Sequence, residues 1–269
     1  MIRWAANLTM LFADSPFMER FERAAKAGFR YVEFLFPYGQ DVQAIAGELR
    51  RLGLTQVLFN LPAGDWGAGE RGIANDPGRR EEFRAGVEQA IEIARRLGVQ
   101  RLNCLVGLRR PDVPEAEQRA CVVDNLRHAA DRLAAHGITL MVEPLNDLDV
   151  PGFFLTRSRQ TLALLDEVAR PNVRLQYDIY HMQVMEGNLV HTLRSQVGRI
   201  GHVQIADVPG RHQPGTGEIR YPFVLQALDK AGYDGFVSLE YVPLGSTEES
   251  LRQAAASGLA ALGFPVPAA

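Results

Sequence analysis

Short apolar runs and segments with helical periodicity alternate eight times along this chain. Apolar runs bounded by Gly, Pro or Asp are typical of buried strands, and apolar residues three and four positions apart indicate amphipathic helices. We predict strands at residues 2–8, 31–34, 56–59, 101–106, 138–142, 173–177, 200–205 and 235–239. We predict helices at residues 16–27, 42–52, 80–97, 115–135, 157–168, 189–197, 222–231 and 247–262.

The number of these units predicts an α/β fold. Parallel strands need long crossover connections, so eight strand–helix units indicate a parallel sheet closed into a (β/α)8 TIM barrel. The 269 residues suffice for one barrel and contain no evident linker, so we predict a single domain over residues 1–269. The stretch at about 60–79 is rich in Gly, Pro and Asp, and we expect a long loop there over the mouth of the barrel.

Four of the later strands carry a polar residue at or near their carboxyl ends, namely Glu143, Asp178, Gln204 and Glu240. Because the carboxyl ends of parallel strands meet at one face, we expect these side chains to share a pocket. Carboxylate and amide oxygens suit a divalent metal ion, with Mg²⁺ expected ahead of Mn²⁺, and spare carboxylates can transfer protons. A structural ion pair with arginine is the alternative for any single carboxylate. Glu33, which ends the second strand, is expected to orient other groups.

Further candidates lie in the loops that follow the strands. His181 comes three residues after a predicted metal ligand, a spacing at which both side chains can face one ligand. Arg71 and Arg211 are candidates for binding a substrate carboxylate, because a guanidinium group matches a carboxylate in bidentate geometry, although loop arginines are as often simply solvated. Trp66 and Glu70 share the long loop, which we interpret as a lid, and Glu70 is counted among the predicted substrate contacts.

Composition and charge restrict the class of protein. The 29 basic and 32 acidic residues give a formal net charge of −3, which offers no cationic excess for nucleic acid or an anionic membrane. The two cysteines, Cys104 and Cys121, lack the spacing of a zinc site and fit a reducing cytoplasm. The N-terminal stretch makes a poor secretion signal, so we expect a cytoplasmic protein. The predicted helices on the outside of the barrel could support a homodimer.

Several long motifs resemble the hydroxypyruvate isomerase family. They are spread over nearly the whole chain and read WAANLTMLF, GFRYVEFLFPY, NLPAGDWGAGERGIA, LNCLVG, EPLNDLDVPGFFLT, QYDIYHMQVMEG, GHVQIADVPGRHQPGTGEI and SLEY. The resemblance implies a xylose isomerase-like barrel that interconverts hydroxypyruvate and tartronate semialdehyde (2-hydroxy-3-oxopropanoate). The chain departs from the family pattern at Phe59, where we expect a histidine before NLPAGDW, and this change bears on a substrate contact or on the choice of substrate.

The resemblance also implies roles for individual residues. Glu143 and Glu240 are implied as the proton-transfer pair, and both surround the metal ion together with Asp178 and Gln204. His181 and Arg211 are implied as substrate contacts. The reaction agrees with these residue types, because moving a carbon-bound proton from C3 to C2 through an enediol needs a base, an acid and an electrophile that stabilises the oxyanion.

Three alternatives are weighed against this interpretation. A 2-oxo-tetronate isomerase, or a related sugar-acid isomerase or epimerase, would use the same two glutamates on a longer substrate. A metal-dependent DNA-repair endonuclease would need a multi-zinc cluster, but three of the six histidines, His128, His136 and His191, fall on predicted helices or directly after one. A non-enzymatic binder of sugar acids would not need two carboxylates at the metal.

Overall fold

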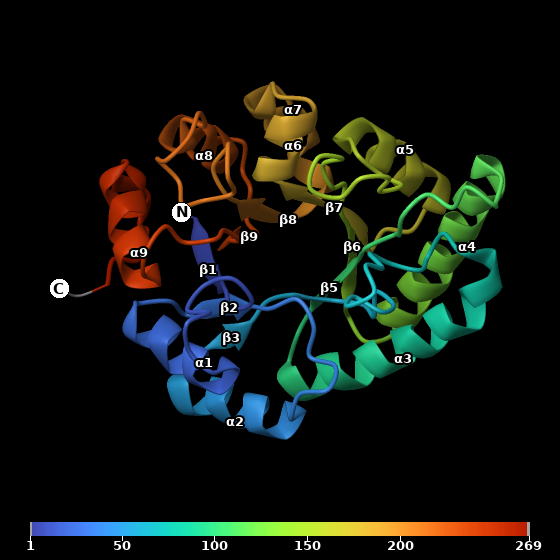
Figure 1. Ribbon diagram of the computed structural model, residues 1–269, viewed down its shortest axis with the longest axis horizontal. Coiled ribbons are helices and arrows are strands. Elements are labelled where there is room, and N and C mark those ends of the chain that lie inside the picture. The colour runs from blue at the N-terminus through green and yellow to red at the C-terminus, as the bar shows by residue number, and fades with distance from the viewer. Residues whose placement is uncertain (1, 268–269) are drawn as a thin grey trace.

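Nine short parallel strands form a ring at the centre of the computed structural model, which describes residues 2–267, and helices surround this ring (Figure 1). Along the sheet the strands follow the order β3-β2-β1-β9-β8-β7-β6-β5-β4. Their bounds are β1 (Arg3–Asn7), β2 (Tyr31–Glu33), β3 (Thr55–Gln56), β4 (Phe59–Asn60), β5 (Arg101–Cys104), β6 (Thr139–Val142), β7 (Val173–Asp178), β8 (Ile200–Ile205) and β9 (Phe236–Leu239).

The two ends of this strand order come from one stretch of chain, and this closes the barrel. β3 pairs with β2 and β4 pairs with β5, while both lie within residues 55–60. The predicted third strand, 56–59, therefore spans a break, at which the Gln56 side-chain amide donates a hydrogen bond of 2.7 Å to the Leu58 carbonyl. Counting β3 and β4 as one staggered strand gives eight barrel positions, which confirms the predicted (β/α)8 fold.

Each of the eight predicted helices has a counterpart in the structure. The helices are α1 (Phe17–Lys26), α2 (Val42–Leu52), α3 (Arg80–Leu97), α4 (Glu115–Ala134), α5 (Ser158–Val168), α6 (Ile179–Met185), α7 (Leu189–Gln196), α8 (Tyr221–Lys230) and α9 (Thr247–Ala256). The short helix α6 was not predicted, and its first turn is capped by the Asp178 side chain, which accepts a hydrogen bond of 2.8 Å from the Tyr180 amide. Among the described residues, no helix is long and apolar enough to cross a membrane.

The last predicted helix, 247–262, is longer than the helix in the structure. α9 ends at Ala256, and the chain continues through a left-handed Gly258 into a 3₁₀ turn, Leu259–Leu262. Two further 3₁₀ turns lie among the described residues: Pro77–Arg79 leads into α3, and Val197–Arg199 leads into β8. These differences leave the positions of the strands unchanged.

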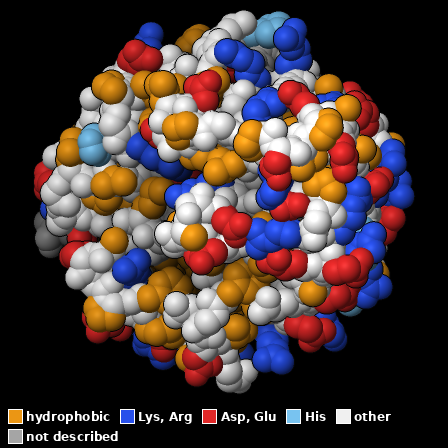
Figure 2. All heavy atoms as spheres, turned by 45° about the vertical axis from the view of Figure 1, so that its right-hand side comes forward, with side chains coloured by type: hydrophobic (Ala, Val, Ile, Leu, Met, Phe, Trp, Pro, Cys, Tyr) orange, Lys and Arg blue, Asp and Glu red, His pale blue; other side chains and the backbone are white. Residues whose placement is uncertain are grey.

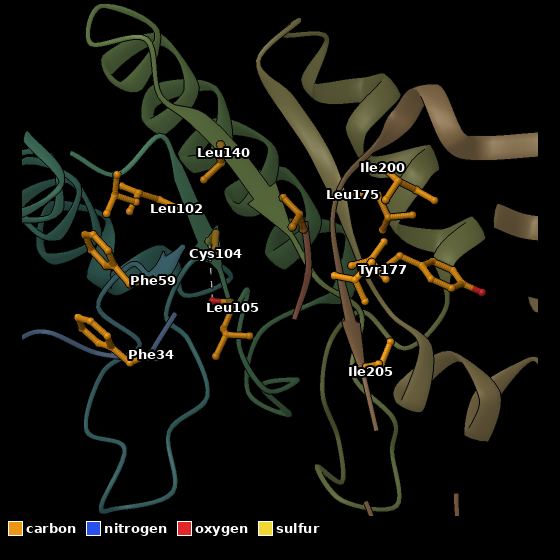
Figure 3. Packing of buried hydrophobic residues seen from close by; sticks show 14 of the residues in the cluster. Phe34, Phe59, Leu102, Cys104, Leu105, Leu140, Leu175, Tyr177, Ile200 and Ile205 are labelled. Atoms are coloured by element: carbon orange, nitrogen blue, oxygen red, sulfur yellow. Dashed lines mark hydrogen bonds between the residues drawn. The ribbon is translucent and has the colours of Figure 1, made fainter. Parts of the chain in front are cut away.

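Apolar and polar layers divide the interior of the barrel along its axis. The main hydrophobic cluster packs the helices against the outside of the sheet, and Figure 3 shows part of it around Leu102, Leu140 and Leu175. A smaller cluster of Ala5, Val57, Leu58, Met141 and Phe236 fills the inside near the amino ends of the strands. Buried polar side chains gather instead toward the carboxyl ends, and they include Asn7, Glu33, Asn103, Asp178, His202 and Gln204. The polar end is the one at which (β/α)8 enzymes carry their sites.

The long loop that follows β4 is fastened at its base. The Gly72 amide donates a hydrogen bond of 2.9 Å to the Ala63 carbonyl, and Gly72 also forms a bridge with Val106 of the next strand–helix connection. Asn75 donates through its side chain to the Leu108 carbonyl at 2.6 Å. Toward the tip, the Trp66 ring packs against Phe36, with ring centroids 5.0 Å apart. The loop is thus a closed unit whose two ends lie side by side.

Gly72 allows the close approach at the base of this loop, and we expect Gly72→Ala to destabilise the protein. Its φ is +118°, and an added Cβ would lie 1.9 Å from the Leu105 carbonyl oxygen. Positive-φ strain costs about 1–3 kcal/mol and overpacking about as much again, so the melting temperature should fall by roughly 4–12 °C. Gly69→Ala is the matched control, because Gly69 has φ +95° and no atom within 4 Å of an added Cβ. Equal losses in both variants would show that the contact with Leu105 is unimportant.

Candidate active site

The structure brings three of the predicted carboxylates to the polar end of the barrel. Glu143 directly follows β6, Asp178 ends β7, and Glu240 directly follows β9. Ligand atoms of Glu143, Asp178 and His181 all lie within 4.8 Å of one another. Arg211 joins the third carboxylate to this group, since its Nη2 lies 2.6 Å from Glu240 Oε2 and 3.6 Å from Asp178 Oδ2. All three carboxylates are buried.

A cavity of about 520 Å³ opens above these groups. Its polar lining includes both glutamates, together with His181, Arg211, Arg71, Asn60, Asp149 and Tyr180, and its apolar lining includes Met10, Leu35, Trp66, Leu105, Leu145, Val150 and Val242. Asp178 and Gln204 lie outside this lining and are completely buried or nearly so. The two glutamates therefore face the space in which a small molecule would bind, and Asp178 lies deeper.

Two asparagines hold the glutamates in place. Asn103 donates a hydrogen bond of 2.8 Å from Nδ2 to Glu143 Oε2. Asn7 donates from Nδ2 to Glu240 Oε1 at 3.0 Å and to Glu33 Oε1 at 2.9 Å. Because buried polar groups with fixed partners do not rotate freely, each glutamate presents its carboxylate to the cavity in one orientation.

Gln204 takes part in a buried hydrogen-bond network below the cavity. Its Nε2 donates to Glu33 Oε1 at 2.8 Å, and its Oε1 accepts from Gln176 Nε2 at 2.6 Å. The contact with a carboxylate fixes which end of the amide is nitrogen. An amide oxygen has a second lone pair, so the metal-ligand role of Gln204 stays a prediction.

Burial governs the charge states of the site. Burial, followed by the neighbouring carboxylates, raises the pKa of Glu143 well above its ordinary value. Burial likewise raises the pKa of Asp178, and that of Glu240 to about 8, although Arg211 opposes the shift in both. Burial lowers the pKa of His181 well below its ordinary value, so its imidazole is neutral. The site thus holds acidic groups with raised pKa values beside a neutral imidazole, a combination suited to proton transfer.

A divalent cation fits this group of residues. Within the described part of the chain, Asp178 Oδ2 is buried and has no hydrogen-bond partner, although its other oxygen caps α6. Glu143, Asp178 and Glu240 bring three buried carboxylates together, and the guanidinium of Arg211 pairs with Glu240. Since buried charges need partners, a cation that accepts oxygen ligands would balance both the charge and the unpaired oxygen.

Arg211 lies in a strained stretch of backbone. Its φ of +57° is left-handed, a conformation that non-glycine residues adopt rarely and that occurs often at functional sites. Its carbonyl accepts a hydrogen bond of 2.8 Å from the Val242 amide, and its guanidinium lies 5.2 Å from the centre of the Tyr180 ring. These contacts hold the guanidinium beside Glu240.

The predicted loop residues occupy different environments. Arg71 lines the cavity, with its guanidinium 4.0 Å from the centre of the Trp66 ring and bonded to the Trp66 carbonyl. Glu70 lies outside the lining of this cavity, because its carboxylate binds Arg79 and the Asp65 amide, and its substrate contact stays a prediction. It therefore fastens the loop.

Phe59, at which the chain departs from the family pattern, also lies outside the lining of the cavity. Its side chain is completely buried in the main hydrophobic cluster, where it packs edge-on against Tyr38, with centroids 6.3 Å apart. Figure 3 shows it among these apolar side chains with Leu102 of the neighbouring strand. The next residue, Asn60, points to the other face of β4 and lines the cavity instead.

Several residues of the site were not predicted from the sequence. They are Asn7, Asn60, Asn103, Asp149 and Tyr180. The three asparagines lie at or next to the carboxyl ends of β1, β4 and β5, so the signal that found the later carboxylates was present for them too. Asp149 and Tyr180 lie in a connection and in α6, where no local pattern marks them.

Comparison with known proteins places this fold and site in a family. A family model described as xylose isomerase-like TIM barrel matches residues 21–260. The chain belongs to this family.

Its relatives include enzymes with assigned reactions. Hydroxypyruvate isomerase of Escherichia coli K12 is 50% identical over 94% of this chain and 98% of its own length. A 2-oxo-tetronate isomerase of Cupriavidus necator is 43% identical over 93% of this chain and 96% of its own length. A crystal structure described as AP endonuclease, family 2, from Brucella melitensis has a TM-score of 0.93 at 46% identity, covering 95% of this chain and 99% of that one.

We expect the metal-free protein to lose thermal stability as the pH rises. A carboxyl group with a raised folded pKa stabilises the fold below its unfolded pKa, and this contribution is lost as the pH rises through the folded pKa. For Glu240 the window runs from 4.5 to about 8. The melting temperature, measured with chelator from about pH 5 to about pH 9, should therefore fall.

Two controls accompany this measurement. Glu240→Gln should flatten the pH dependence, because the amide does not titrate. Added Mg²⁺ should raise the melting temperature more at high pH than at low pH, because a metal ion binds deprotonated ligands. A melting temperature that rises across the window in the presence of chelator would contradict the account of the buried carboxylates.

Proposed function

We propose that this protein is an isomerase that interconverts hydroxypyruvate and tartronate semialdehyde through an enediol. The observation that carries the proposal is the pair Glu143 and Glu240, both buried, both with raised pKa values, and both facing one cavity. The 50% identity to a hydroxypyruvate isomerase over nearly the whole chain supports this substrate.

The two glutamates supply the acid and the base. One takes the proton from C3, so that the C–H electrons form the C2–C3 double bond and the C2 oxygen takes up negative charge. The other delivers a proton to C2, and the C3 hydroxyl proton passes to the C2 oxygen, so that C3 becomes the aldehyde and the C2 oxygen becomes a hydroxyl group. Since burial and mutual repulsion raise both pKa values, one member of the pair can hold a proton near neutral pH while the other is ionised.

Other cavity residues bind and orient the substrate. Arg71 would bind the substrate carboxylate, because its guanidinium is held on Trp66 at the edge of the cavity. Arg211 and His181 would contact the oxygens at C2 and C3. Glu143, Asp178 and Glu240, with Gln204, would hold a divalent ion, for which we propose Mg²⁺. That ion, when bound, would supply Lewis-acid stabilisation of the developing negative charge.

The setting of the reaction follows from the same proposal. Both compounds are three-carbon oxo acids, and we propose that the enzyme acts in the metabolism of glyoxylate and related acids. Cys104 and Cys121 are free and buried, as expected for a protein of the reducing cytoplasm. The loop at 61–79 would act as a lid that excludes water from the enediol.

A 2-oxo-tetronate isomerase is the second candidate. Its substrate has one carbon more and the same carboxylate and carbonyl groups. A cavity of about 520 Å³ has room for the longer acid, and the 43% identity to such an enzyme from Cupriavidus necator supports it. The ratio of kcat/KM for the two acids decides between these substrates.

The site is less suited to a DNA-repair endonuclease. His181 is the single histidine that lines the cavity among the described residues, whereas a multi-zinc cluster needs several. Figure 2 shows acidic and basic side chains intermixed on the face that it presents. Partly exposed ion pairs such as Arg132–Glu88 and Arg119–Glu167 offset part of the surface charge, which does not favour a polyanion.

The proposal predicts proton exchange at carbon. In a proton NMR time course in D₂O with Mg²⁺, hydroxypyruvate should be converted to tartronate semialdehyde with deuterium on the product carbon. Glu143→Gln and Glu240→Gln should each lower kcat by about 10²–10⁴, because each loses a proton-transfer group. Glu92→Gln, on the exposed surface of α3, is the matched control and should keep full activity.

The outcomes separate the two candidate substrates. Exchange with 2-oxo-tetronate but not with hydroxypyruvate would assign the longer substrate. If folded protein that binds Mg²⁺ exchanges carbon-bound protons in neither acid, proton transfer by the two glutamates is refuted.

A further inference from the structure

Asn146 lies beside His181 and contacts its inner ring nitrogen twice. The backbone amide of Asn146 lies 3.1 Å from His181 Nδ1, and the side-chain Nδ2 lies 2.7 Å from the same atom. Both residues are buried. Asn146 therefore presents two N–H groups to one nitrogen of the imidazole.

The orientation of the Asn146 amide is fixed by its other partners. Its Oδ1 accepts hydrogen bonds from the Leu148 and Asp149 amides, at 3.1 and 2.7 Å. Its Nδ2 donates to Asp149 Oδ2 at 3.0 Å, and Tyr180 donates through its hydroxyl to the same oxygen at 2.7 Å. Exchanging the oxygen and nitrogen of the amide would break the three bonds that the Asn146 side chain makes with Leu148 and Asp149, so the group facing His181 is the N–H.

This arrangement determines the tautomer of the histidine. A nitrogen that accepts two N–H bonds carries no proton, so in a neutral imidazole the proton lies on the other nitrogen, Nε2. Nε2 lies 3.6 Å from Asp178 Oδ2, and His181 lines the cavity. A metal ligand that binds through Nε2 needs the opposite arrangement, with Nδ1 donating to a carbonyl or carboxylate.

We infer that Asn146 is a positioning residue that holds His181 as an Nε2–H donor to a substrate oxygen and keeps it from ligating the metal ion. The inference rests on the proposed function only in naming the oxygen that receives this hydrogen bond. The carboxylates of Glu143 and Asp178 then supply the metal site, and His181 stabilises negative charge on the enediol as a neutral donor.

The tautomer can be measured without substrate or metal. In metal-free protein with ¹⁵N-labelled histidine, two-bond ¹H–¹⁵N correlation spectra should show a protonated Nε2 and a bare Nδ1 for His181. The signal is assigned by its absence from His181→Gln. A proton on Nδ1 in the unaltered protein would overturn the inference.

Asn146→Asp tests the role of the side chain. The variant places an acceptor 2.7 Å from Nδ1, so this nitrogen should become protonated. With the tautomer lost, kcat should fall by about 10²–10⁴ with little change in KM, as a wrong tautomer costs about 10⁴ in serine proteases. Asn146→Asp/Asp149→Asn keeps the net charge and should show the same Nδ1 proton if the single variant does not fold. A bare Nδ1 in the folded variant would overturn the inference.

Two comparisons complete the experiment. Asn125→Ala is the matched control. Asn125 is also a buried asparagine, but its Nδ2 donates a hydrogen bond to the Ala74 carbonyl and not to His181. The His181 spectrum of this variant should be unchanged.

Metal binding is the second comparison. In calorimetric titration with Mn²⁺, Asp178→Asn should weaken Mn²⁺ binding by about 10–100-fold and His181→Gln by less than about threefold. Equal losses would overturn the inference, whereas a correct tautomer without isomerase activity would count against the proposed function alone.

Discussion

One buried carboxylate, that of Glu33, connects three strands of the barrel below the cavity. It accepts hydrogen bonds from Asn7 of β1 and from Gln204 of β8, and His202 of β8 lies 2.7 Å from its other oxygen. An ionised carboxylate without partners is costly to bury, so these side chains must be in place when the barrel closes. Asn7 extends the same constraint to Glu240, and the position of the proton-transfer group therefore depends on Glu33.

Glu33 and Glu240 are both buried, yet their pKa values shift in opposite directions. Burial raises the pKa of Glu33, but the charge and hydrogen bond of His202, with those of Gln204 and Asn7, lower it below its ordinary value. Burial raises the pKa of Glu240, Arg211 opposes the shift, and the charges of Asp178 and Glu33 add to it, so the pKa stays raised. Neighbours therefore decide which carboxyl group stays ionised and which one titrates near neutral pH.

Periodicity predicted the barrel because each amphipathic helix and buried strand leaves its own pattern. The strand-end rule located Glu143, Asp178 and Glu240, which the structure brings together, but among the earlier strands it was applied to Glu33 alone and so missed Asn7 and Asn103. Side-chain direction was not predictable. Glu70 lies in the expected loop yet turns to Arg79, and Phe59 lies on the face of β4 opposite the cavity. Such outcomes depend on contacts between segments far apart in the sequence.

In the proposed reaction, the loop tip would couple the exclusion of water to substrate binding. Gly72 fastens the base of the loop against Leu105 and Val106, so a movement of the loop is confined to the part beyond the bond between Ala63 and Gly72. Within that part Arg71 is stacked on Trp66 and bonded to its carbonyl, and both line the cavity. The cation that would bind the substrate carboxylate therefore moves together with the ring that covers the cavity, and neither can reach its place without the other.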